Sequence, residues 1–404
     1  MPEDTMPVVQ GSEPERFQTS RVLTITGGHA VHDTYTAFLP PLLPAFIASL
    51  TLSTTEAGLL SVFLQAPSLL QPFIGHLADR VSLRYLVILA PTVTAVAMSL
   101  LGVAPDYAAL AVLLVVAGFG SATLHAVGPV MVGNLSGRSL GRGMGFWMVG
   151  GELGRTLGPI VIVSVVQLIT LRGTPWLMGA GLLASFILYI RLKGVPGRPP
   201  NAARSRPWRR ALRMMRPLLA PLVVLVVVRA FMIVALTTYL PTFLTEEGAD
   251  LWFAGASLSL LEAAGVGGAL LGGSLSDWLG RQRVLWVSLL TAALFMLVFL
   301  GVKGWTRLPV LLVLGFTALS ITPVLMALVQ ESVPENRALA NGIYMALNFS
   351  IRSVVVVVLG AMGDLFGLRP AYMVSAIIPL LGLPFIFLLP GKTNPGHNAP
   401  SSGP

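Results

Sequence analysis

The 404-residue sequence contains no cysteine, and only 11% of its residues are Asp, Glu, Lys or Arg. The absence of cysteine excludes disulfide bonds and thiol chemistry. Soluble domains carry about 25% charged residues, so the low charge content excludes an ordinary soluble protein. The sequence also lacks metal-ligand spacings, a nucleotide-binding loop and a sizeable polar domain. These absences argue against an enzyme, a metal site or a cofactor. Without a nucleotide-binding loop, any movement of a solute by this chain is expected to be driven by an ion or solute gradient and not by ATP.

Long apolar runs dominate what is present, because 54% of the residues are hydrophobic. About 20 such residues cross a bilayer core of ~30 Å, and a spanning segment must satisfy its own backbone polar groups. We therefore expect an all-α membrane protein in contact with the lipid bilayer. Twelve helices are predicted, at 21–48, 56–77, 84–104, 107–132, 141–169, 174–191, 216–244, 251–276, 283–303, 308–331, 338–365 and 369–390.

A Pro- and Arg-rich segment, 192–215, divides the chain near its midpoint. It is too polar to span a bilayer, so we interpret it as a cytoplasmic basic linker between a six-helix half at 21–191 and a second at 216–390. Residues 1–20 are predicted to form a cytoplasmic tail without a cleaved signal peptide, and residues 391–404 a disordered tail.

The net charge of +9 indicates membrane topology. Nineteen of the 26 Lys and Arg residues fall in the predicted loops and tails on one side of the membrane, and four fall on the other. Basic residues are enriched in cytoplasmic loops, which places both termini in the cytoplasm. This distribution accounts for the basic charge without a nucleic-acid partner.

An internal repeat supports two equivalent halves. Gly75, Leu77 and Asp79 recur as Gly273, Leu275 and Asp277, with a constant offset of 198 residues. Each copy follows the second predicted helix of its half. Parallel six-helix repeats place the substrate site at their interface, near the middle of the membrane.

These two loops resemble the signature loops of the major facilitator superfamily. The resemblance implies a gating role for Gly75, Asp79, Arg80, Arg84, Gly273, Asp277 and Arg281. The fifth predicted helix carries Gly145, Gly154, Gly158 and Pro159, a pattern similar to that of drug/proton antiporters in this superfamily. Small residues at this spacing let another helix approach closely, so generic helix packing is the alternative interpretation.

Further short stretches resemble the fosmidomycin resistance protein family of bacterial efflux transporters. They are Gly28-His29 with His32-Asp33, Pro41 to Pro44, Gly118 to His125, Val149 to Gly154, and Arg229 with Tyr239 and Pro241. The resemblance implies a monomer in the bacterial cytoplasmic membrane that moves a small molecule in exchange for protons.

Ionisable side chains inside the membrane cost several kcal/mol unless they face a partner or a cavity, and are functional candidates by default. The candidates are His29, His32, Asp33, His125, Glu152, Arg155, Arg229, Glu262 and Arg352. At 1.5 Å per residue, most lie roughly 16–21 Å from the nearer helix end. The repeat places Arg229 near the equivalent of Asp33, so these two are expected to face each other.

Proton exchange is assigned to Asp33 with His29, and also to Glu152, Glu262 or His125. Substrate binding is assigned to Arg229, Arg352, Arg155, Tyr239, Trp147 and Phe38, with Phe231 and Tyr344 as further lining residues. Structural alternatives remain open. Glu152 and Arg155 are spaced to form a salt bridge within one helix, and His32 and His125 can serve packing or hydrogen bonding.

The favoured function is proton-coupled efflux of a small anionic or amphipathic drug-like compound. The alternative is uptake or facilitated passage of a nutrient such as an organic anion or a sugar. A membrane enzyme or receptor is the third possibility, and the sequence offers no catalytic constellation for it.

Overall fold

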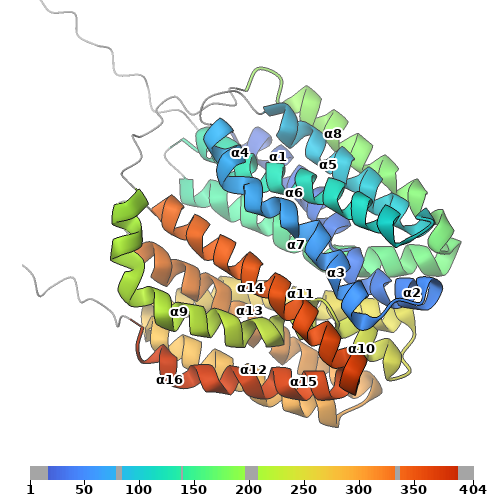
Figure 1. Cartoon of the computed structure of the whole chain (residues 1–404). Coiled ribbons are helices and arrows are strands. Elements are labelled where there is room, and N and C mark those ends of the chain that lie inside the picture. Colours follow the sequence, from blue (N-terminus) through green and yellow to red (C-terminus); the bar gives the residue numbers. More distant parts are fainter. Residues whose placement is uncertain (1–16, 79–83, 138–139, 196–207, 333–336, 390–404) are drawn as a thin grey trace, which may run out of the picture.

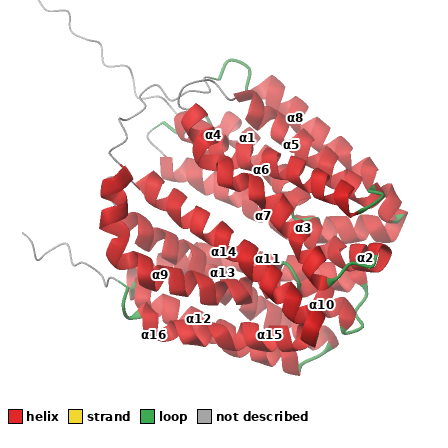
Figure 2. Cartoon of the chain, in the orientation of Figure 1, coloured by secondary structure: helices red, strands yellow, loops and turns green. Residues whose placement is uncertain are grey.

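The computed structural model describes residues 17–78, 84–137, 140–195, 208–332 and 337–389. These residues form helices joined by short loops, with no strand among them (Figure 2). Residues 1–16 of the predicted N-terminal tail, the predicted C-terminal tail, residues 196–207 of the linker, and the loop residues Asp79 and Arg80 lie outside the described part.

The first half of the chain comprises α1 (Thr19–Thr36), α2 (Leu39–Leu50), α3 (Thr54–Gln65), η1 (Ala66–Leu70), α4 (Gln71–Ala78), α5 (Arg84–Leu100), η2 (Leu101–Val103), α6 (Tyr107–Leu135), α7 (Leu140–Ile169), η3 (Leu171–Leu177) and α8 (Met178–Arg191). The second half comprises α9 (Trp208–Thr237), α10 (Leu240–Glu246), α11 (Leu251–Leu279), α12 (Arg281–Gly301), η4 (Gly304–Thr306), α13 (Arg307–Ser332), α14 (Arg337–Phe366), α15 (Leu368–Ile377), η6 (Ile378–Gly382) and α16 (Leu383–Ile386). Helices α1 to α8 lie together, and α9 to α16 form a second group beside them (Figure 1).

Ten of the predicted spans appear as helices long and apolar enough to cross a membrane. The first two are interrupted. The helix that starts at α1 breaks between Thr36 and Leu39, because Pro40 and Pro41 have no N–H to donate to the preceding turn. The second span passes through the 3₁₀ turn η1, which contains Pro67. The seventh predicted span, 216–244, also breaks, between Thr237 and Leu240. The all-α membrane fold is as predicted.

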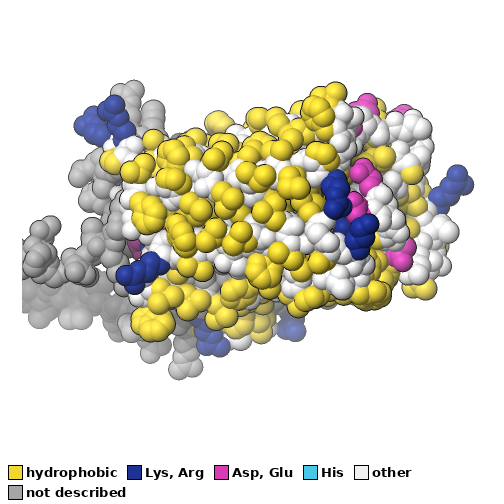
Figure 3. Space-filling view, turned by 90° about the horizontal axis from the view of Figure 1, so that it is seen from below, with side chains coloured by type: hydrophobic (Ala, Val, Ile, Leu, Met, Phe, Trp, Pro, Cys, Tyr) yellow, Lys and Arg dark blue, Asp and Glu magenta, His cyan; other side chains and the backbone are white. Residues whose placement is uncertain are grey.

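The surface of the helix bundle fits a lipid environment. The face seen in Figure 3 is covered mostly by apolar side chains, and its charged side chains gather toward the two ends. Large apolar side chains such as Leu168 and Trp278 are 81% and 78% exposed. Apolar exposure on this scale marks a surface that contacts membrane or a partner.

The two halves meet along α3 and α14, along α7 and α11, and at the contacts that α2 makes with α10 and α11. The α7–α11 contact includes a hydrogen bond from the Ile160 amide to the Ser259 hydroxyl, at 3.0 Å. Trp252 Nε1 donates to the Ser164 hydroxyl at 3.3 Å in the same contact.

A carboxylate from the second half caps a helix of the first half at what we call the α2–α10 end of the molecule. Asp364 accepts hydrogen bonds from the amides of Thr54 and Thr55, at 2.5 and 3.0 Å, and from the Thr55 hydroxyl at 2.5 Å. Beside it, the Tyr239 hydroxyl donates to the Val356 carbonyl at 2.9 Å and lies 3.3 Å from the Thr54 carbonyl. Negative charge is stabilised at a helix N-terminus, so this contact favours the closed arrangement of this end.

Glycines bring α7 against α1 within the first half. A Cβ atom on Gly154 would lie 2.5 Å from the Ala30 carbonyl oxygen, and one on Gly158 would lie 2.5 Å from that of Thr34. Gly145, by contrast, has no neighbouring atom within 4 Å of such a Cβ position. Two glycines of the antiporter pattern therefore allow the α1–α7 contact, and Gly145 is not needed for it.

Replacing Asp364 by alanine should loosen the α2–α10 end. A capping side chain contributes about 0.5–2 kcal/mol, and about 1.4 kcal/mol changes a population ratio tenfold. We expect Asp364→Ala to populate a longer distance between spin labels placed at Thr51→Cys and Glu246→Cys, since both positions are exposed and the chain has no native cysteine. Pulsed electron paramagnetic resonance measures this distance.

The matched control is Asp106→Ala. Asp106 caps α6 by accepting from the Ala109 amide at 2.8 Å, within one half. Its loss should lower stability and leave the label distance unchanged. An unchanged distance in Asp364→Ala would show that Asp364 does not hold this end closed.

Gly154→Ala should destabilise the first half by about 1–3 kcal/mol, because the added methyl group meets backbone that cannot move aside. Gly145→Ala should be neutral or slightly stabilising, because alanine has the higher helix propensity. Thermal unfolding of the two purified variants in detergent compares them directly. Equal unfolding temperatures would contradict the close α1–α7 packing.

Candidate functional site

Helix α1 supplies the first two residues of the site. His29 and Asp33 are four residues apart, so they share one face of the helix. Their side chains approach at 3.3 Å between His29 Nε2 and Asp33 Oδ2, and each residue is only 3% exposed. His32, on the neighbouring face, lies 3.9 Å from Asp33 Oδ1, and neither of its ring nitrogens has a hydrogen-bond partner among the described residues.

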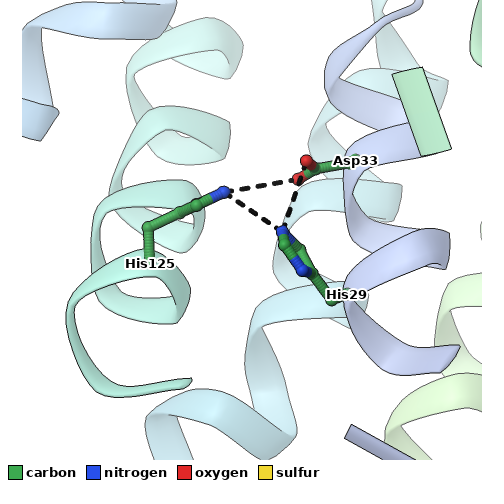
Figure 4. Close-up of side chains that lie close together, drawn as sticks. All are labelled: His29, Asp33 and His125. Carbon is green, nitrogen blue, oxygen red and sulfur yellow. Dashed lines mark hydrogen bonds and ion pairs between the residues drawn. The ribbon is translucent and has the colours of Figure 1, made fainter. Parts of the chain in front are cut away.

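Helix α6 supplies His125, which points at the α1 pair (Figure 4). Its Nδ1 lies 2.9 Å from the Ser121 carbonyl oxygen, one turn earlier. This contact directs Nε2 toward α1, where it lies 3.2 Å from His29 Nε2 and 3.7 Å from Asp33 Oδ1. The donor atoms of His29, Asp33 and His125 all lie within 4.8 Å of one another, so these residues can hold a metal ion. No spacing in the sequence predicts this set, since the third donor lies 96 residues from His29.

Helix α7 completes this cluster with Trp147, Glu152 and Arg155. The Trp147 carbonyl oxygen lies 2.9 Å from His29 Nδ1, and the indole stacks on the imidazole with ring centroids 3.7 Å apart. Arg155 Nη1 lies 3.8 Å from Asp33 Oδ2, and the same guanidinium pairs with Glu152, as their spacing predicts. The Arg155 side chain is 44% exposed, so it is accessible although it sits in the middle of a spanning helix.

The second half contributes Arg229, Arg352 and Glu262. Arg229 of α9 donates to the Thr322 hydroxyl at 2.5 Å and lies 3.3 Å from the Ala318 carbonyl, both on α13. It makes no ion pair with Asp33. In this arrangement Arg229 is hydrogen-bonded within its own half and Asp33 lies beside Arg155. The expectation that Arg229 and Asp33 face each other stays a prediction.

Arg352 of α14 donates to the Thr237 hydroxyl at 3.2 Å. Glu262 of α11 is 9% exposed, and its charged neighbours are Arg155, Glu152 and Arg352. It forms no ion pair within 4.0 Å among the described residues. Glu262 is thus a buried carboxylate whose nearest cations come from both halves and are not in contact with it.

Most of the aromatic candidates lie in packed positions. Phe38 is fully buried beside Tyr35, with ring centroids 4.9 Å apart. Tyr239 is fully buried in the contact with Val356 and Thr54 described above, and Tyr344 is 1% exposed. Trp147 is the aromatic candidate that contacts the ionisable cluster.

The second signature loop forms an ion-pair network. Arg281 binds Asp277 and Glu331, each at 2.6 Å, and hydrogen-bonds the Ser276 hydroxyl. The partner of Asp277 is therefore Arg281, one helical turn away. The sequence analysis does not predict Glu331 as a partner of Arg281, because Glu331 lies on another helix, α13.

In the first loop, Gly75 lies in α4, and Arg84 starts α5, where it donates to the Val195 carbonyl at 3.3 Å. Other residues missed from sequence are Ser121, Thr237, Thr322 and Asp364. Each is a small polar residue or a residue at a helix end, and no sequence pattern marks its partner.

Comparisons with known proteins agree with this architecture. The chain is 24% identical over 373 residues to the fosmidomycin resistance protein of Escherichia coli strain K12, covering 90% of this chain and 91% of that protein. It is 25% identical over 372 residues to YfnC, an MFS-type transporter of Bacillus subtilis strain 168, covering 90% of each.

Among solved structures, the fold matches a bacterial homologue of the human lysosomal transporter Spinster in an inward-facing and unoccupied conformation. The TM-score is 0.78 at 15% identity, and the match covers 94% of this chain and 98% of that one. The family model of the Major Facilitator Superfamily matches residues 25–356. The chain is therefore a multi-pass membrane transport protein that belongs to the Major Facilitator Superfamily.

Proposed function

We propose that the chain exports a small anionic or amphipathic drug-like compound across the bacterial cytoplasmic membrane in exchange for protons. In this proposal both termini face the cytoplasm, and the transporter acts as a monomer. The observation that carries the proposal is Glu262, a buried carboxylate between the halves that has no ion-pair partner in the described part of the chain.

Glu262 is suited to bind and release a proton during the transport cycle. A charged carboxylate inside a membrane protein is costly unless it is paired, whereas a nearby arginine favours its charged form. Helices α11 and α7 pack against each other, and Arg155 on α7 is a charged neighbour of Glu262. Relative movement of the halves changes this separation, and with it the affinity of Glu262 for a proton.

Exchange requires that an empty transporter does not reorient. Attraction between charged Glu262 and Arg155 provides this restraint, because it joins the two halves. A proton on Glu262 removes the attraction, and a substrate that binds the Arg155 guanidinium also removes it. Either ligand therefore releases the halves for reorientation, as antiport requires.

The arginines define the substrate chemistry. Arg155 and Arg352 are partly accessible, and the Nε atoms of Arg229 and Arg352 have no hydrogen-bond partner among the described residues. Guanidinium groups bind oxyanions such as carboxylates and phosphates through paired hydrogen bonds. The similarity to the fosmidomycin resistance protein of Escherichia coli also supports a drug-like substrate.

Proton-coupled uptake is the second candidate, and one observation favours it. The charges of the candidate residues cancel, because three carboxylates match three arginines. They are Asp33, Glu152 and Glu262, and Arg155, Arg229 and Arg352. A proton and a monovalent anion bound together would preserve this neutrality, which suits co-transport in the same direction. An organic anion taken up as a nutrient is the corresponding substrate.

The test uses proteoliposomes that contain a pH-sensitive dye and a panel of anionic and amphipathic compounds. We expect a substrate of the wild-type protein to move protons opposite to its own direction. Glu262→Gln keeps the size of the side chain and removes its charge change. We expect this variant to lose substrate-triggered proton movement while the substrate still equilibrates down its gradient.

Glu246→Gln is the matched control, because Glu246 is an exposed glutamate at the end of α10, and it should behave as wild type. Proton movement that persists in Glu262→Gln would contradict the role of Glu262. Movement of substrate and protons in the same direction would replace export with co-transport, and substrate movement without protons in the wild type would contradict coupling.

A further inference from the structure

Donor atoms of three residues lie close together between α1 and α6, at separations similar to those between neighbouring ligands of one metal ion. His29 Nε2 lies 3.2 Å from His125 Nε2 and 3.3 Å from Asp33 Oδ2, and His125 Nε2 lies 3.7 Å from Asp33 Oδ1. Tetrahedral Zn²⁺ sites with bonds of about 2.0–2.1 Å place neighbouring ligand atoms ~3.3 Å apart. The separations of His29 Nε2 from His125 Nε2 and from Asp33 Oδ2 are close to this value, and the third, which involves the other Asp33 oxygen, is longer.

The orientation of the two imidazoles is fixed by backbone carbonyls. Nδ1 of His29 lies 2.9 Å from the Trp147 oxygen, and Nδ1 of His125 lies 2.9 Å from the Ser121 oxygen. A carbonyl oxygen only accepts hydrogen bonds, so both Nδ1 atoms carry the hydrogen. In the neutral rings, both Nε2 atoms then present lone pairs to each other at 3.2 Å. A carbonyl behind each ring is also the usual support of a metal-binding histidine.

Two lone pairs at this distance require a cation between them. A shared proton would bridge the two rings, but it would leave the buried Asp33 Oδ1 without a hydrogen-bond partner among the described residues. A metal ion binds both nitrogens and the carboxylate at once. The surrounding charges permit it, because Asp33 and Glu152 carry two negative charges against the single positive charge of Arg155.

We propose that His29, Asp33 and His125 bind one divalent transition-metal ion of the Zn²⁺ type. Imidazole ligands favour Zn²⁺ and its first-row neighbours over Mg²⁺ and Ca²⁺. The His125 side chain is 31% exposed, which gives the ion access and leaves a coordination position open beside Arg155. The ion joins α1 to α6 within one half, so it does not prevent the halves from moving.

The experiment titrates the purified full chain in detergent with Co²⁺, after removal of any polyhistidine tag. We expect one Co²⁺ per chain with the visible absorption of a four-coordinate ion, and displacement by Zn²⁺. His125→Gln removes a ligand from the accessible side and should lower the affinity by more than about 100-fold, since even a lost supporting group costs about 10–100-fold.

His32→Gln is the control, because His32 lies on the same helix and its ring nitrogens are outside the donor set. It should keep the Co²⁺ spectrum. X-ray absorption of the Zn²⁺-loaded wild type tests the same proposal without a variant, and should show two imidazole nitrogens in the ligand shell. Absence of stoichiometric binding, a six-coordinate spectrum, or equal binding by His125→Gln would overturn the metal site. Absence of binding would leave a shared proton as the occupant.

Discussion

A charge placed halfway through a bilayer must find a charge of opposite sign or a polar cavity, and this constraint organises the interior of the molecule. Asp33 is surrounded by Arg155 and the imidazoles of His29 and His125. Arg229 and Arg352 use hydroxyl and carbonyl oxygens of neighbouring helices. Glu262 is the exception, because the charges nearest to it remain outside contact distance. The proposed function uses this exception, since an unpaired carboxylate is the group whose charge responds most to movement of the halves.

Arg155 connects the two parts of the site. It contacts Asp33 and Glu152 within the first half and lies in the electrostatic range of Glu262 in the second. Its helix, α7, packs on α1 through Gly154 and Gly158 and on α11 through Ser259. Any movement of α7 relative to α11 therefore alters the surroundings of one carboxylate in each half. The glycines keep α7 fixed to α1, so this change is concentrated at the interface.

Much of the architecture is predictable from sequence, because length and apolar content identify the helices that span a membrane. The i,i+4 and i,i+3 spacings also predict that His29 lies against Asp33 and that Glu152 pairs with Arg155. The partners across helices are not predictable in this way. The rotation of each helix about its axis decides whether Arg229 faces Asp33 or α13, and a single sequence does not specify that rotation. Nor does a residue pattern identify the carbonyls of Trp147 and Ser121 as partners, because every residue has a carbonyl.

The contact between Asp364 and α3 has a consequence for how such proteins diverge. Two of its three hydrogen bonds are donated by backbone amides, those of Thr54 and Thr55. Substitution at position 54 therefore leaves the contact in place, provided that the new residue keeps its amide hydrogen. Correlated mutation between positions 54 and 364 is not expected, although the two segments touch. A contact between the halves that uses backbone donors persists when the donor side chains change. Methods that infer contacts from paired substitutions will therefore miss it.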